Sequence, residues 1–151
     1  MSAFSKYFLR LARCSSGSAL VEMTLVVPVA ISLMVGGVDF GLALSAQATA
    51  AKSVRDAARY LGSLRAGECT GQIASAQNLA VYGNLAGTGN PLVPNWNATG
   101  GTNNNVNVTC ASTIIVSAKI PYTSIINAPF LPIESTYTLS TQHEEPQVGG
   151  S

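Results

Sequence analysis

Residues 19–46 read ALVEMTLVVPVAISLMVGGVDFGLALSA, a stretch that is almost entirely apolar or small. As an α-helix this stretch would be about 42 Å long, enough to cross the hydrocarbon core of a bilayer. Glu22 and Asp39 are its only charged residues, and they bracket an uncharged segment, Met23–Val38. The stretch therefore predicts a transmembrane helix, which we place at residues 18–46.

Two features predict how this helix packs. Pro28 cannot donate a hydrogen bond to the carbonyl of Thr24, which predicts a kink, and Gly36-Gly37 loosens the helix further. Gly37 and Gly41 have the spacing of small residues that lets two helices approach closely in lipid. We therefore expect Gly37 and Gly41 to serve helix packing.

Residues 1–17 contain Lys6, Arg10 and Arg13 and no acidic residue, as in a positively charged cytoplasmic leader. The whole chain is 47% hydrophobic and only 10% charged, which fits a membrane segment joined to one small domain. Its formal net charge of +1 provides no basic surface for nucleic acid, so we expect no nucleic-acid partner.

The cysteines divide by position, since Cys14 precedes the apolar stretch while Cys69 and Cys110 follow it. The latter two would share one compartment, which predicts a Cys69–Cys110 disulfide there. Two buried free thiols are the alternative. His143 is the only histidine and the chain has no CxxC motif, so we expect neither a metal nor a cofactor.

The remaining residues, 47–151, predict an α+β domain. Residues 47–64 have helical periodicity, with an apolar face and an opposite, solvated charged face. The apolar face comprises Ala51, Val54, Ala58 and Leu61, and the charged face Lys52, Arg55, Asp56 and Arg59. After a break at Gly67–Gly71, residues 73–82 predict a short helix.

Residues 83–105 are rich in Gly, Asn, Pro and Thr, which is typical of a loop. We expect Trp96 within it to cover the local core rather than to bind a ligand. Three strands follow, at residues 106–110, 114–120 and 135–141, forming an antiparallel sheet packed on the helix. Residues 122–133 are predicted to be an irregular connection because of the prolines around them, and the tail after Gln142 to be frayed.

Immediately before the apolar stretch the chain reads Gly17-Ser18-Ala19-Leu20-Val21-Glu22. This junction resembles a type IV prepilin processing site, in which a basic leader ends in Gly and Glu is the fifth residue after the cut. The resemblance implies cleavage between Gly17 and Ser18. It also implies that the Glu22 carboxylate neutralises the new amine of Ser18 among packed helices. The alternative for Glu22 is a carboxylate that marks the helix end in interfacial water.

The match extends further along the chain. The ordered blocks Glu22–Pro28, Asp39–Gly41 and Ala57–Tyr60 resemble the N-terminal domain of the TadE-like family, pseudopilins or minor pilins of tight-adherence (Flp) pilus systems. The resemblance covers about residues 17–62. It departs at Met23, where an aromatic residue usually follows the glutamate.

The resemblance implies a protein that is not an enzyme and that acts in pilus initiation or assembly. Its implied partners are the prepilin peptidase, other pilin-like subunits, the inner-membrane assembly platform and membrane lipid. The expected location is the inner membrane, with a single span and the C-terminal domain in the periplasm. Incorporation into the extracellular pilus is a second expected location.

Three other interpretations compete with this one. A bitopic membrane structural protein would keep the same span without being processed. A secreted protein would lose a signal peptide near Leu44-Ser45-Ala46, but the apolar stretch is long for a signal peptide and contains Glu22. A membrane-anchored enzyme would need a catalytic arrangement of side chains, and no such motif stands out around His143 or Glu144-Glu145.

Overall fold

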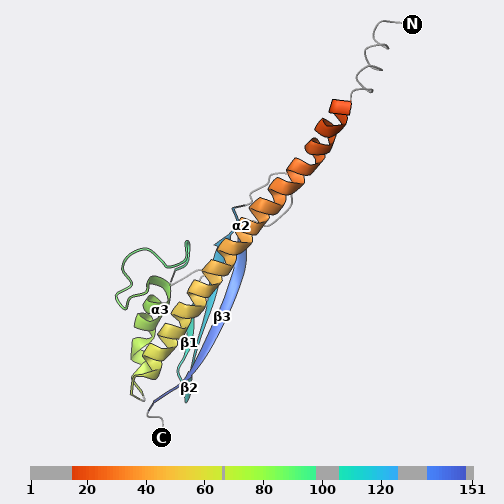
Figure 1. Ribbon diagram of the computed structural model, residues 1–151. Helices are drawn as coiled ribbons and strands as arrows, with labels where there is room; N and C mark the ends of the chain where they lie inside the picture. The colour runs from red at the N-terminus through yellow and green to blue at the C-terminus, as the bar shows by residue number, and fades with distance from the viewer. Residues whose placement is uncertain (1–14, 66, 98–105, 126–135, 149–151) are drawn as a thin grey trace, which may run out of the picture. The chain divides into compact units, whose positions relative to one another are not determined.

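The computed structural model describes residues 15–65, 67–97, 106–125 and 136–148, with side chains from residue 19 onward. It is an α+β structure, as the sequence predicts (Figure 1). Its elements are, in chain order, α2 (Ser15–Gly62), the 3₁₀ helix η1 (Cys69–Gln72), α3 (Ile73–Tyr82), β1 (Val106–Thr109), β2 (Thr113–Thr123) and β3 (Thr136–Pro146). The chain divides into two compact units, Met1–Val38 and Asp39–Ser151, and α2 contributes to both.

Among the described residues of the first unit, α2 is the only element, and its large apolar side chains are exposed. The helix continues through Pro28 without interruption. The hydroxyls of Thr24 and Ser32 each donate to the carbonyl four residues earlier, on Leu20 and Pro28, with oxygen separations of 2.7 Å in both cases. These polar side chains are therefore satisfied within the helix, as an apolar environment requires. The kink at Pro28 stays a prediction.

In the second unit, α2 packs one face against the sheet. The buried helix residues are Ala50, Val54, Ala57, Ala58 and Leu61. The predicted apolar face is thus confirmed for three of its members, but Ala51 is only half-buried and Ala50 takes its place. Ala50, Val54 and Leu61 follow one another at steps of four and seven residues, which keeps them on the same side of an α-helix.

The sheet has the strand order β1-β2-β3 with both pairs antiparallel. Val116 lies at its centre, opposite Val108 of β1 and His143 of β3. Every second residue of β2 from Ile114 to Ile120 is buried, and this face meets α2 and the loop residues to form the hydrophobic core.

Both β2 and β3 are longer than predicted. The structure places Pro121, Tyr122 and Thr123 in β2, so the expectation that residues 122–133 form an irregular connection was wrong for its first two residues. Among the described residues, β1 pairs only as far as Ala118, so Pro121 has one neighbouring strand there, where a residue without an N–H group is tolerated. Residues 126–133 lie outside the described residues.

Residues 143–146 are strand, which corrects the prediction of a frayed end for this part of the tail, and residues 149–151 lie outside the described residues. β3 continues to Pro146, which pairs with Thr113. His143 and Glu145 continue the half-buried side of the strand, and the His143 Nε2 and Glu145 Oε2 atoms lie 3.2 Å apart, within hydrogen-bond distance. The antiparallel pairing with β2 therefore holds a polar segment that has no hydrophobic signal of its own.

The remaining parts of the second unit close the core. The predicted short helix is confirmed as α3, and the Gln77 amide nitrogen donates to the Val106 carbonyl at 2.8 Å, linking α3 to β1. Trp96 is fully buried, as expected for a residue that covers the core. Its indole nitrogen has no hydrogen-bond partner within the described part of the chain.

The disulfide between Cys69 and Cys110 is present and joins the start of η1 to the residue after β1. It connects residues 41 apart in sequence. Cys14 lies outside the described residues. The bridge restrains the unfolded chain on both sides of α3, so its main effect is on the stability of the second unit.

We expect replacing Cys69 and Cys110 together by Ala to lower the free energy of unfolding by about 2–4 kcal/mol. Denaturant titration of detergent-solubilised protein, followed through Trp96 fluorescence, measures this. Cys14→Ala is the matched control and leaves the midpoint unchanged. Equal midpoints for the parent protein and the double variant would contradict a stabilising bridge.

Candidate functional site: the helix start and the Asp39 contacts

The predicted processing junction lies at the start of α2. The described part of α2 starts at Ser15, so Gly17 and Ser18 lie within the helix. Glu22 is exposed one turn further on. Among the described residues, the Glu22 carboxylate makes no hydrogen bond or ion pair within the chain. The proposed partner of Glu22, an amine on Ser18, forms only after cleavage.

The two glycines predicted to serve helix packing lie in open parts of α2. A Cβ atom built on Gly37 or on Gly41 would meet no atom within 4 Å. Nothing in the described chain therefore occupies the space beside either backbone. The role of Gly37 and Gly41 in helix packing stays a prediction.

Asp39, the first residue of the second unit, makes the most extensive side-chain contacts of α2. One carboxylate oxygen, Oδ2, accepts a hydrogen bond from the Ser124 hydroxyl at 2.9 Å. The other, Oδ1, accepts from the backbone N–H of Ile125 at 2.9 Å and lies 3.0 Å from the Tyr122 hydroxyl. The same hydroxyl lies 3.0 Å from the Asp39 backbone carbonyl, so its single hydrogen is shared between two acceptors.

These contacts tie the helix to the end of β2. Tyr122 is in β2, and Ser124 and Ile125 follow it directly. Burial raises the pKa of the Tyr122 phenol above its ordinary value of 10.0, and the hydrogen bond to the Asp39 carboxylate raises it further. Tyr122 therefore remains a protonated donor at neutral pH.

Sequence reasoning missed this role of Asp39. From the sequence, Asp39 only marks the end of the uncharged segment Met23–Val38. In the structure its partners belong to the same chain, 83 to 86 residues later, and none is a cation. No local pattern could have found them, because Tyr and Ser beside a proline read as ordinary loop residues.

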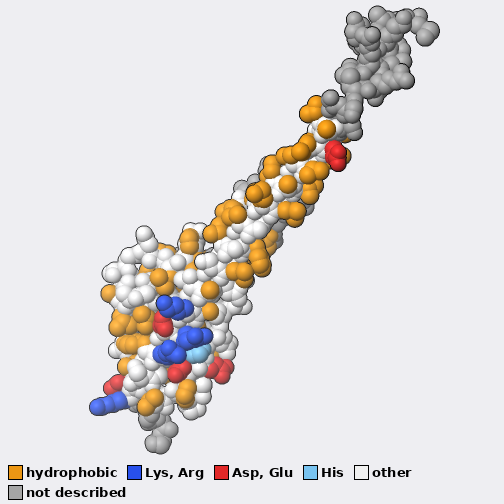
Figure 2. All heavy atoms as spheres, in the orientation of Figure 1, with side chains coloured by type: hydrophobic (Ala, Val, Ile, Leu, Met, Phe, Trp, Pro, Cys, Tyr) orange, Lys and Arg blue, Asp and Glu red, His pale blue; other side chains and the backbone are white. Residues whose placement is uncertain are grey.

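The charged side of α2 is solvated, as predicted. Lys52, Arg55, Asp56 and Arg59 are all exposed. Figure 2 shows Lys and Arg side chains gathered on the second unit, while hydrophobic side chains cover α2 in the first. Within the described ranges, no group of three His, Cys, Asp or Glu side chains lies close enough to hold a metal ion.

The helix has the length and composition of a membrane span. Among the described residues, the segment Ala19–Gly62 of α2 is long and apolar enough to cross a bilayer. The family model described as TadE-like protein matches residues 17–59. This segment is TadE-like. The match confirms the resemblance inferred from the sequence.

The TadE-like segment contains the junction, the apolar helix and Asp39, whereas the sheet and the disulfide lie outside it. The family is structural rather than enzymatic, and the match supports a pilin-like, pilus-associated protein that associates with pilus subunits. Together with the apolar helix it indicates a membrane-anchored protein. No curated protein and no solved structure matches the chain.

We expect Asp39→Asn to lower the unfolding midpoint of the second unit, because the amide nitrogen of Asn cannot accept the hydrogen bond that one carboxylate oxygen now accepts. Thermal unfolding followed through Trp96 fluorescence measures the change. Asp56→Asn, an exposed substitution on the same helix, is the control and changes stability by no more than about 0.5 kcal/mol. If both variants unfold at the same temperature, the Asp39 contacts do not stabilise the domain.

Proposed function

We propose that this protein is a membrane-anchored, pilin-like subunit of a tight-adherence pilus system that acts in pilus initiation or assembly. The observation that carries the proposal is the TadE-like match over a helix whose apolar first part leads directly into a folded α+β domain at Asp39. Such a chain can present a domain at the membrane surface while its helix packs among other helices. Its partners would be other pilin-like subunits and the inner-membrane assembly platform.

We propose that the membrane-embedded part is Ala19–Val38, shorter than the 18–46 expected from the sequence. These 20 residues form a helix about 30 Å long, which equals the hydrocarbon thickness of a typical bilayer. Asp39 then has its acceptor oxygens satisfied by the domain at the point where the span ends. Residues 40–46 would lie on the domain's side of the bilayer.

The remaining parts of the proposal concern processing and topology. Cleavage after Gly17 by the prepilin peptidase would leave Ser18 as the new N-terminus and remove the basic leader. Gly17 lies within α2, and a glycine lowers the cost of locally unwinding the helix at the cleavage site. The Cys69–Cys110 disulfide fits a domain in the oxidising periplasm, with the protein in the inner membrane.

The experiment that tests the proposal is identification of the N-terminal residue of protein purified from membranes. Ser18 supports processing as a pilin. Met1 or Ser2 would indicate an unprocessed bitopic protein, the competing interpretation, and a residue near Ala46 would indicate removal of a signal peptide.

If the peptidase requires a small residue before the cut, Gly17→Leu should accumulate a membrane-inserted precursor that is heavier by the leader. Immunoblots of membrane fractions measure the shift. Gly36→Leu is the matched control, since it places the same side chain in open space within the span and leaves processing unchanged. Normal processing of Gly17→Leu would contradict the assigned cleavage site.

Glu22→Ala should give a processed, membrane-resident protein that no longer enters pili. In lipid a carboxylate at this depth can reach interfacial water, but among packed helices the Ser18 amine would lose its counter-charge. Breaking such a buried pair weakens assembly on the order of a hundredfold or more. The protein recovered with sheared pili measures this loss.

Two further variants calibrate the result. Glu22→Asp keeps the charge with a shorter reach and should be intermediate, while Glu68→Ala removes an exposed carboxylate from the domain and should assemble normally. Full assembly of Glu22→Ala would leave Glu22 as an interfacial carboxylate without a pairing role.

A further inference from the structure

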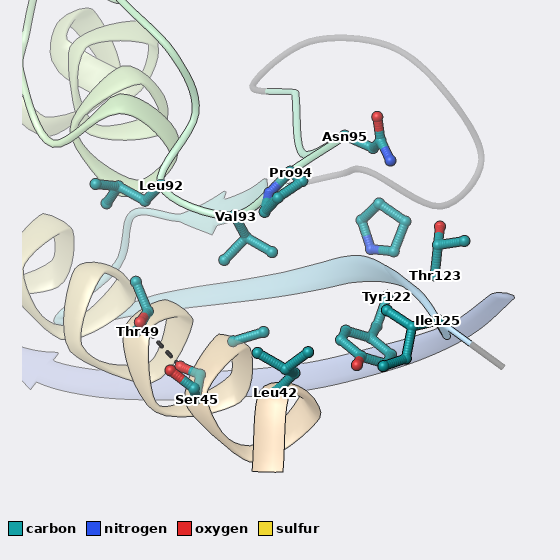
Figure 3. A pocket seen from close by; sticks show the side chains of 12 residues that line it. Leu42, Ser45, Thr49, Leu92, Val93, Pro94, Asn95, Tyr122, Thr123 and Ile125 are labelled. Carbon is teal, nitrogen blue, oxygen red and sulfur yellow. Dashed lines mark hydrogen bonds between the residues drawn. The ribbon is translucent and has the colours of Figure 1, made fainter. Parts of the chain in front are cut away.

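A groove of about 320 Å³ lies in the second unit between α2, the loop at residues 92–95 and the end of β2. Figure 3 shows the Leu42, Val93 and Tyr122 side chains arranged around it, from three separate parts of the chain. None of its twelve lining residues is charged. Its volume is at the lower end of the range for pockets that bind small ligands.

The groove adjoins the Asp39 contacts. Tyr122 and Ile125 line it and also donate hydrogen bonds to Asp39. Leu42, another lining residue, follows Asp39 by three positions, about 4.5 Å along the helix. If the bilayer ends at Asp39, as proposed above, the groove opens beside the lipid headgroups and the first methylenes of the acyl chains.

Several of the apolar side chains that line the groove are exposed. Ile125 is 56% exposed and lines the groove, and Leu42 is 47% exposed. Phe40 and Leu44, two residues before and two residues after Leu42 on α2, are 66% and 50% exposed but do not line the groove. Exposed apolar surface of this kind is unfavourable in water by about 25 cal/mol per Å². A hydrocarbon chain that covers Leu42 and Ile125 would remove this apolar surface from water.

A second cavity of the same unit provides a contrast. It has a volume of about 270 Å³, and Lys52 and Asp56 are among its lining residues. Both residues lie more than two helical turns beyond Leu44 on α2. After Asp39, the next charged residue on α2 is Lys52, whereas the groove next to Asp39 has no charged lining residue.

We propose that the groove binds an aliphatic chain of a membrane lipid from the leaflet on the domain's side. An uncharged, largely apolar groove suits a hydrocarbon chain and not a phosphate or a charged peptide. Lipid is also the partner that an anchored domain always has beside it. This inference rests on the membrane anchorage within the proposed function, and its test separates the two.

The test is photo-crosslinking of the full-length protein in phosphatidylglycerol and phosphatidylethanolamine vesicles that contain a phospholipid with a diazirine on one acyl chain. Peptide mapping then locates the adducts. Adducts within residues 19–38 report membrane anchorage alone. Adducts at Leu92–Asn95, which lie outside α2, report an acyl chain in the groove. We expect adducts both in residues 19–38 and at Leu92–Asn95.

A matched pair of variants shows whether the groove itself is responsible. Ser45 is exposed and lines the groove, so Ser45→Phe should fill it and remove the Leu92–Asn95 adducts while those in residues 19–38 persist. Gln47→Phe places the same ring outside the groove and should retain both sets. Trp96 fluorescence establishes that each variant is folded. If a variant does not fold, the adducts mapped on the parent protein still test the proposal.

The outcomes separate cleanly. Adducts confined to residues 19–38, or Leu92–Asn95 adducts that persist in Ser45→Phe, would overturn lipid binding in the groove and leave the anchor intact. Leu92–Asn95 adducts that fall as protein density in the vesicles rises would assign the groove to a second copy instead. An absence of adducts in residues 19–38 would overturn the membrane anchorage as well.

Discussion

The hydrogen bonds accepted by Asp39 are the interaction on which the second unit depends. An apolar helix that continues into a folded domain needs a fixed point where the domain begins, and the Asp39 carboxylate supplies it. Its donors come from the end of β2 and the two residues after it. Because β2 is the central strand, a restraint on its end also positions β1 and β3 through their pairing.

Small side chains allow the rest of the domain to be built on one helix. Ala50, Ala57 and Ala58 are fully buried on α2 and leave room in the core for the larger buried side chains of Val54 and Leu61. The core then depends on β-branched residues of β2 and on Trp96, in a chain that is only 7% aromatic. A domain with so few aromatic side chains is stabilised further by a disulfide. The Cys69–Cys110 bridge joins the start of η1 to the residue after β1.

Polarity changes along α2 in a consistent order. Residues 19–38 are apolar and exposed, Asp39 is bonded to the domain, Phe40 to Leu44 are again largely apolar, and charged residues begin at Lys52. The proposed bilayer position, the proposed lipid groove and the solvated stripe follow this order. The proposal thus assigns lipid, the interface and water to successive parts of one helix. Among the described residues of α2 from Asp39 onward, Asp39 is hydrogen-bonded to the domain and the other charged side chains are exposed to water.

The sequence by itself determined the elements whose signal is local. Hydrophobic periodicity and composition depend on residues that are close in sequence. They predict the apolar run, the short helix at residues 73–82 and the three strands, and the TadE-like blocks are likewise local sequence patterns. The pairing of Cys69 with Cys110 was also accessible, because two cysteines beyond one span share a compartment.

Only the tertiary structure decided the features that depend on contacts between distant residues. The extension of β3 through His143 to Pro146 comes from pairing with β2, which holds a polar segment that has no apolar pattern of its own. The role of Asp39 and the groove beside it require residues more than 80 positions apart to meet. Hydrogen bonds and packing act through space, so a reading along the chain identifies Asp39 as a charge but not its partners.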